Sequence, residues 1–126
     1  MKLVVLFFLF LFFNNINAQN SFKKDISFKY NYIFFEGLKH KSLYNYNKAK
    51  EYYLDCVDLN KNESAAYYEL ALILLDENSL DQSLFYIKQA VNINPNNESY
   101  LLIKAEVLQK QGKYIEASNV YENLIT

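Results

Sequence analysis

Residues Ser64–Asn97 read SAAYYELALILLDENSLDQSLFYIKQAVNINPNN, and their pattern recurs on both sides at a period of 34 residues. The recurring residues are small at two positions of the unit and large and apolar at a third: Gly37, Ala71 and Ala105; Ala49, Ser83 and Ala117; and Tyr53, Ile87 and Tyr121. Self-similarity at a fixed period of this length is typical of stacked helical repeats. The sequence therefore predicts an all-α fold of stacked antiparallel helix pairs, with about three units.

Local signals divide the repeat region into its units. In the second unit Asn62 is the expected N-cap of the first helix, and Ser79 with Gln82 has the form of a capping box before the second helix. Pro95 then stops that second helix, and Gly112 supplies the turn of the third unit. We expect one domain over residues 30–126, with repeats at about 30–63, 64–97 and 98–126, the last of them incomplete.

The composition indicates a folded domain that does not bind nucleic acid. Of the 126 residues, 52% are hydrophobic and 17% are aromatic, which excludes a disordered chain. The formal net charge is −1 and every basic residue is a lysine, so no nucleic-acid surface is expected. Cys56 is the only cysteine, so no disulfide can form within the chain.

The N-terminal residues MKLVVLFFLFLFFNNINAQ have the form of a secretory signal peptide. Lys2 is followed by an unbroken apolar run, Leu3–Phe13, and by a short polar region that ends at Ala18. The run is too short to span a bilayer as a stable helix, so we expect a signal peptide over residues 1–18, cleaved after Ala18, rather than an uncleaved anchor. The protein is then exported, meets the membrane only transiently, and begins with a lead-in segment over residues 19–29.

The units resemble the tetratricopeptide repeat. The residues that carry the resemblance are, in the second unit, Tyr67, Leu70 and Ala71 of the first helix and Leu80, Ser83, Ile87 and Ala90 of the second, followed by Pro95, and in the third unit Gly112, Tyr114, Ala117 and Tyr121. The resemblance covers about Tyr30–Thr126 and implies an α-solenoid with a right-handed superhelix. The leader and the tyrosine-rich repeats also resemble exported repeat proteins of the Bacteroidetes envelope, which implies a bacterial periplasm or cell envelope, or secretion.

The sequence departs from the family pattern at a few positions. Glu36 and Lys104 stand where the second unit has Leu70. Lys61 replaces the proline that follows a second helix, and Ser83 replaces an alanine. The charge at Glu36 makes the first unit look like a capping repeat.

In the tetratricopeptide family the concave face is lined mainly by first helices and holds an extended or helical peptide. By register, the resemblance implies a partner-binding face formed by Phe34, Leu38 and Lys41 in the first unit, Tyr68, Leu72, Leu75 and Asp76 in the second, and Leu102, Glu106 and Gln109 in the third. This lining suits a partner helix or hydrophobic segment, and the alternative is that it packs against further repeats or the lead-in segment. At the family's carboxylate-clamp positions stand residues without a cationic donor, so that clamp is not expected: Phe34, Leu38, Glu69, Ser99 and Ile103.

The last helix ends with Val120, Leu124 and Ile125, which no fourth unit covers. An exposed apolar end is a liability that solvating terminal helices normally remove. We therefore expect that the chain is the front of a longer one, or that it docks this C-terminal apolar edge on a partner.

Support for catalysis is nearly absent. His40 is the lone histidine, with no cysteine or carboxylate constellation that the sequence places beside it, and Cys56 stands where a small buried residue is needed. No Cys/His metal spacing or nucleophile elbow occurs, and two glycines are too few for a phosphate-binding loop. We expect no enzyme activity, no cofactor and no metal.

The sequence therefore predicts a noncatalytic protein–protein interaction scaffold of the cell envelope or periplasm, which binds a partner helix or peptide on the concave face. Two alternatives remain open. The chain is the N-terminal repeat region of a longer envelope assembly protein, or it recruits substrate for an enzyme whose catalytic domain lies beyond Thr126.

Overall fold

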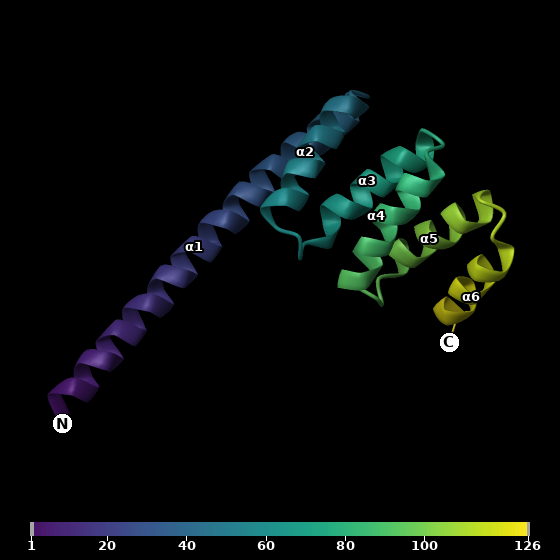
Figure 1. Cartoon of the computed structure of the whole chain (residues 1–126). Coiled ribbons are helices and arrows are strands. Elements are labelled where there is room, and N and C mark those ends of the chain that lie inside the picture. The colour runs from purple at the N-terminus through teal and green to yellow at the C-terminus, as the bar shows by residue number, and fades with distance from the viewer. Residues whose placement is uncertain (1, 126) are drawn as a thin grey trace.

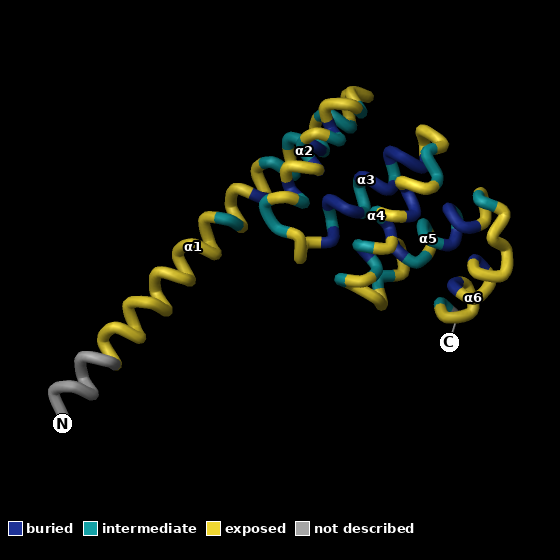
Figure 2. The backbone as a smooth tube through the Cα atoms, in the orientation of Figure 1, coloured by how far each residue is buried: buried dark blue, intermediate teal, exposed yellow. Residues whose placement is uncertain are grey.

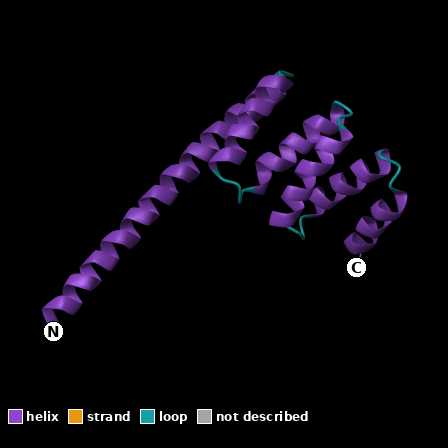
Figure 3. Ribbon diagram, viewed as in Figure 1, coloured by secondary structure: helices purple, strands orange, loops and turns teal. Residues whose placement is uncertain are grey.

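The computed structural model of the chain describes the backbone of residues 2–125 and the side chains of residues 9–124. Within this part the structure consists of six helices joined by short turns (Figure 3): α1 (Lys2–Ser42), α2 (Tyr46–Leu59), α3 (Ser64–Asp76), α4 (Leu80–Ile93), α5 (Glu98–Lys110) and α6 (Tyr114–Ile125). Each helix packs against the next, so that the pairs α1–α2, α3–α4 and α5–α6 form three stacked units (Figure 1). The predicted α-solenoid is confirmed.

Helix α1 is longer than the repeat pattern predicts. We expected the first helix to begin near Tyr30, but it begins at Lys2 and projects away from the stack (Figure 1). No glycine or proline precedes Gly37, so nothing in this stretch interrupts an α-helix. The projecting part is exposed along its described length apart from half-buried Ile26, and Tyr30 is its first buried residue (Figure 2). The packed stack thus begins where the repeat pattern begins.

The N-terminal apolar run lies in this projecting part of α1. Within the described residues, no helix combines the length and the apolarity that crossing a membrane requires.

The turn within each unit is built in the same way three times. Tyr44, Asn78 and Gly112 stand 34 residues apart and have positive φ angles of 58°, 58° and 77°. In each turn, the N–H of this residue donates to the carbonyl three residues earlier at 3.0 Å, and the next N–H donates five residues back. These two bonds form the Schellman motif that ends a helix. The sequence analysis assigned this left-handed geometry only to Gly112, although asparagine, as at Asn78, also favours it.

The helix starts follow the predicted caps only in part. Helix α3 begins after Glu63 rather than Asn62, and Ser79 precedes α4 without making a side-chain cap bond. Both capping predictions are therefore wrong in detail. Side-chain caps occur instead at Asn45 and Asn97, whose Oδ1 atoms accept from the backbone N–H three residues later. These two caps serve α2 and α5.

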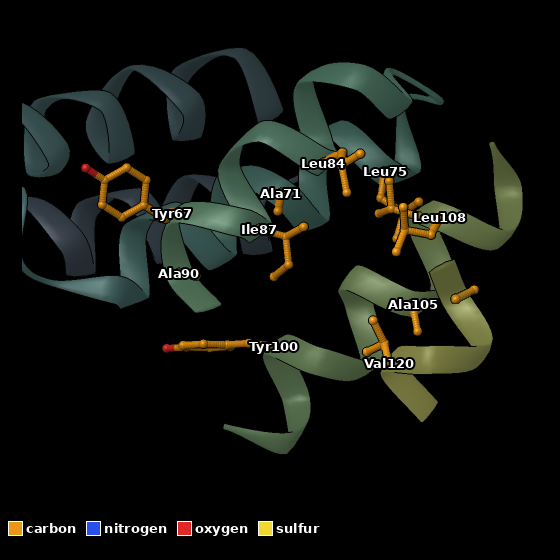
Figure 4. Close-up of a cluster of buried hydrophobic side chains, with 12 residues drawn as sticks. Tyr67, Ala71, Leu75, Leu84, Ile87, Ala90, Tyr100, Ala105, Leu108 and Val120 are labelled. Carbon is orange, nitrogen blue, oxygen red and sulfur yellow. The ribbon is translucent and has the colours of Figure 1, made fainter. Parts of the chain in front are cut away.

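Small residues allow the helices to pack closely. Ala71, Ala90 and Ala105 are completely buried in the core cluster that joins the second and third units (Figure 4). Ser83, which replaces the family's alanine, is also completely buried, and its Oγ donates to the carbonyl of Ala71 at 2.7 Å. The hydroxyl is therefore satisfied, which explains why a polar residue is tolerated at this position.

Gly37 is required by the side chain that faces it. A Cβ atom at Gly37 would lie 2.6 Å from Cε1 of Tyr53, whose ring is completely buried. The equivalent pair of the second unit is Ala71 with Ile87. Ala71 is larger than Gly37, and Ile87 is smaller than Tyr53. The two units thus fill the same space with different pairs of residues.

We predict that Gly37→Ala lowers the free energy of unfolding by about 1–3 kcal/mol, because the tightly packed Tyr53 ring must shift. Gly37→Ala combined with Tyr53→Ile recreates the pair of the second unit and should cost less than the sum of the single changes. Urea unfolding of the four proteins in this double-mutant cycle measures the coupling. Additive losses would contradict the direct contact.

Candidate protein-binding surface

The candidate binding surface follows the outer strip of the first helices. In α3 most side chains face α2, α4 or α5 and are buried, which leaves a narrow accessible strip. The predicted residues on this strip are half-buried or exposed, and we call them the first-helix face: Phe34, Leu38 and Lys41 of α1, Tyr68, Leu72 and Asp76 of α3, and Leu102, Glu106 and Gln109 of α5. The 34-residue register thus places nine of the ten predicted residues at accessible positions.

Leu75 is the exception. Only 7% of it is exposed, and it belongs to the core cluster that also contains Leu84 and Leu108 (Figure 4). One residue along a helix is a rotation of about 100°, which is enough to turn the side chain from the strip toward the core. Its neighbour Asp76 is exposed. We therefore leave Leu75 out of the first-helix face.

Lys41 is engaged in an ion pair that joins two units. Its Nζ lies 2.6 Å from Oε2 of Glu69, and both side chains are more than two-thirds buried. The pair connects α1 to α3 and neutralises the charge that the register placed on this face. The lysine therefore holds the surface together and is not a free cation for a partner.

Aromatic and hydroxyl groups join the second unit to the third. The rings of Tyr68 and Tyr100 lie 4.9 Å apart between centroids. Beneath them, the Tyr100 hydroxyl is 3.1 Å from Ser64 Oγ, and Asn94 Nδ2 donates to that Oγ at 2.8 Å. Because these contacts link α3, α4 and α5, they set the position of the third first helix relative to the second.

Between the first and second units, a tyrosine of the earlier unit contacts the later one, whereas Tyr100 belongs to the later unit of its pair. The Tyr30 hydroxyl of α1 accepts from the backbone N–H of Ala66 in α3 at 3.3 Å. Burial raises the pKa of Tyr30 to about 12, although the bond from Ala66 partly opposes this shift. The hydroxyl therefore stays neutral at ordinary pH.

Phe35 is a surface residue that the sequence analysis did not assign to this face. It is 66% exposed, whereas the residues at the same register position, Glu69 and Ile103, are half-buried, so the repeat pattern gave no signal for it. Phe34, in contrast, packs with its ring 5.6 Å from that of Tyr53 and is partly a core residue. Phe35 therefore supplies the more accessible aromatic group.

The apolar groups of the face form a row that crosses three helices. Phe34, Tyr68 and Leu102 occupy one register position in α1, α3 and α5, and Leu38 with Leu72 continues the apolar area. Of the carboxylates, Glu106 shares its register position with Leu38 and Leu72, and Asp76 is the last residue of α3. The arrangement suits contact with an apolar surface.

The residues considered for catalysis are in structural environments. The His40 ring stacks on Tyr52 with centroids 5.3 Å apart. Burial raises the pKa of the Cys56 thiol to about 12, and its Sγ donates to the carbonyl of Tyr30. Within the part of the chain that the structure describes, no three His, Cys, Asp or Glu residues gather closely enough to hold a metal ion.

The stacked units and their first-helix face define a tetratricopeptide-type α-solenoid. Residues 42–124, well over half of the chain, match the family model described as "Anaphase-promoting complex, cyclosome, subunit 3", and the chain therefore belongs to this family of tetratricopeptide-type repeats. A relative, anaphase-promoting complex subunit 3 of Schizosaccharomyces pombe, is 26% identical over 98 residues. These residues cover 78% of this chain and 15% of that protein, so the chain spans a small part of the relative's length.

Solved structures of low sequence identity share the fold. The MamA protein has a TM-score of 0.72 at 16% identity, over 76% of this chain and 52% of that one. The N-terminal domain of stress-induced protein-1 from C. elegans has a TM-score of 0.72 at 13% identity, over 79% and 84% of the two chains. The Arabidopsis OM64 TPR domain has a TM-score of 0.71 at 18% identity, over 77% and 80%.

We predict that the stack loses stability in alkali. Burial raises the pKa of Tyr30 from about 10 in the unfolded chain to about 12 in the folded one, so the contribution of Tyr30 to stability is complete below pH 10 and is lost as the pH rises toward 12. The loss from such a group is about 1.4 kcal/mol per pH unit within this window. Tyr30→Phe should make the stability curve shallower by this amount, measured by urea unfolding between pH 8 and about 11.5.

Tyr32→Phe is the matched control, because Tyr32 is exposed two residues away on the same helix. An equal change in slope for both variants would contradict the assignment to the buried Tyr30 hydroxyl.

Proposed function

We propose that this chain is a noncatalytic scaffold that binds a helix or peptide of a partner protein on its first-helix face. Domains of the tetratricopeptide type generally act as protein–protein interaction scaffolds. The observation that carries the proposal is the apolar row over Phe34, Tyr68 and Leu102, one residue from each unit, with Phe35 exposed beside it. Apolar groups that recur at accessible positions of successive units are typical of a protein-binding surface.

The apolar row favours a helical partner. A helix that docks on a protein surface presents its apolar face through side chains three, four and seven residues apart. Phe34, Tyr68 and Leu102 offer such a partner one apolar group from each of α1, α3 and α5. The carboxylates of Asp76 and Glu106 beside this row favour a partner with basic residues next to its apolar stripe.

The relative is by name a subunit of a complex, which agrees with a scaffold role. Because this chain matches a small part of that protein, the repeat region of a longer assembly protein is the second candidate. In this second candidate, unlike in a stand-alone scaffold, the repeats bind a partner and bring it to another part of the same protein.

We predict that a photoreactive amino acid at Phe35 or Leu102 cross-links a partner in cells that produce the full chain. The matched controls are Phe85 and Leu54, which are similarly exposed apolar residues on the second helices α4 and α2. Adducts of the same mass at Phe35 and Leu102, and none at Phe85 and Leu54, are the expected result on denaturing gels and by mass spectrometry.

The introduction of glutamate at Leu72 should abolish these adducts, because a charge then lies within the apolar area. Adducts that form equally on the second helices, or that survive Leu72→Glu, would show that the partner uses another surface.

We further propose that the protein is exported to a bacterial periplasm or cell envelope through residues 1–18. Support comes from Lys2, the apolar run Leu3–Phe13 and the small residue Ala18. Removal of this segment leaves the stack intact, since none of the described side chains before Tyr30 is buried.

We predict that a phosphatase reporter fused after Thr126 is active outside the cytoplasm and that the mature chain begins at Gln19. N-terminal mass spectrometry and fractionation measure both. Replacing two leucines of the apolar run by Arg should abolish export and leave residues 1–18 attached. A full-length chain in the cytoplasmic fraction would refute export.

A further inference from the structure

The outward face of α6 lacks the cover that the equivalent faces of α2 and α4 have. Tyr121 is 39% exposed, whereas its repeat equivalents Tyr53 and Ile87 are completely buried. Tyr114 is 67% exposed, whereas its equivalent Leu80 is half-buried. In the interior, α3 packs against α2 and α5 packs against α4. Helix α6 thus continues an interface that the stack forms twice, and none of the described helices covers it (Figure 1).

The exposed residues differ from those that the sequence indicated. Val120, expected to be uncovered, is buried in the core cluster that joins the second and third units, and Leu124 is half-buried. Ile125 lies outside the described side chains. The uncovered apolar residues are instead Tyr114, Ile115 and Tyr121, and together with Ser118 we call them the α6 face.

Ile115 is the most exposed apolar residue of the α6 face. It is 81% exposed, and its repeat equivalents Asn47 and Asp81 are polar. Asp81 accepts a hydrogen bond from Gln111 across a unit boundary, so this register position lies at a junction between units. An isoleucine at an uncovered junction position is unfavourable in water, and an apolar partner removes that cost.

The N-terminal end of another copy does not fit this face. The α3 residues Leu70 and Ile73 are buried in the core cluster shared with α2, but their equivalents in α1 are Glu36 and Lys39. These two form an ion pair at 3.1 Å on the surface. Covering them requires the desolvation of both charges, which disfavours a head-to-tail array of copies. The N-terminal end acts as a polar cap, as its sequence indicated.

We propose that two copies of this chain pair through their α6 faces about a two-fold axis, with the helices antiparallel and Ser118 opposite Ser118. This register sets Ile115 opposite Tyr121 and Tyr114 opposite Glu122, and each pairing occurs twice. Ser118 is small and exposed, so the two helices can approach closely at the axis. The Tyr114 hydroxyl can donate to the Glu122 carboxylate. The face is therefore self-complementary, as an interface between identical surfaces requires.

Disulfide trapping in the full-length chain tests this pair. Ser118→Cys places one thiol of each copy at the two-fold axis, and mild oxidation should convert most of the variant into a covalent dimer on non-reducing gels. Cys56 does not compete, because it is buried. Asn119→Cys is the matched control, since the next residue on the helix points about 100° away from the axis. It should give several-fold less dimer.

A further variant separates the α6 face from association through the apolar N-terminal run. Ile115→Lys in the Ser118→Cys chain should abolish trapping, while circular dichroism shows that the exposed substitution leaves the helices intact. Equal trapping of the two cysteine variants, or trapping that survives Ile115→Lys, overturns the proposal. An absence of trapping in the Ser118→Cys chain also overturns it.

Discussion

The apolar faces of this chain are buried by neighbouring units, and this depends on helices that approach closely. Fully buried Ala71, Ala90 and Ala105 permit that approach, and in the first unit Gly37 leaves space for the ring of Tyr53. A helix pair on its own cannot bury the apolar face that it turns toward the neighbouring unit. Stability is therefore shared among the junctions between units, as in other repeat proteins.

At each of the two junctions between units, a tyrosine of one unit contacts a small residue of the other. The tyrosine comes from the earlier unit at the first junction and from the later unit at the second. Tyr30 reaches forward to Ala66, and Tyr100 reaches back to Ser64. Tyr30 and Ser64 occupy one register position, and Ala66 and Tyr100 occupy another, so the large and small residues are exchanged. In both cases the buried hydroxyl has a partner. These contacts, with the ion pair of Lys41, join the first helix of each unit to the next unit.

Most of the fold was predictable from the sequence, and the local exceptions have physical reasons. The small residues of the core and the turn at Gly112 lie where the repeat pattern places them, because helix periodicity and left-handed glycine geometry are local properties. At the equivalent turns, Asn78 is a residue type that tolerates a positive φ angle, whereas Tyr44 carries no such local signal. The length of α1 was missed because a polar segment was interpreted as a lead-in, although nothing in it breaks a helix.

By itself the sequence determined the repeat length, the pairing of helices and the register of the candidate surface. Each of these follows from apolar and small residues that recur at fixed spacing along the chain. Only the tertiary structure decided that Leu75 belongs to the core, that Glu69 neutralises Lys41 and that Phe35 is exposed. These outcomes depend on which neighbouring helix each side chain faces, and a rotation of one residue about a helix axis changes that neighbour.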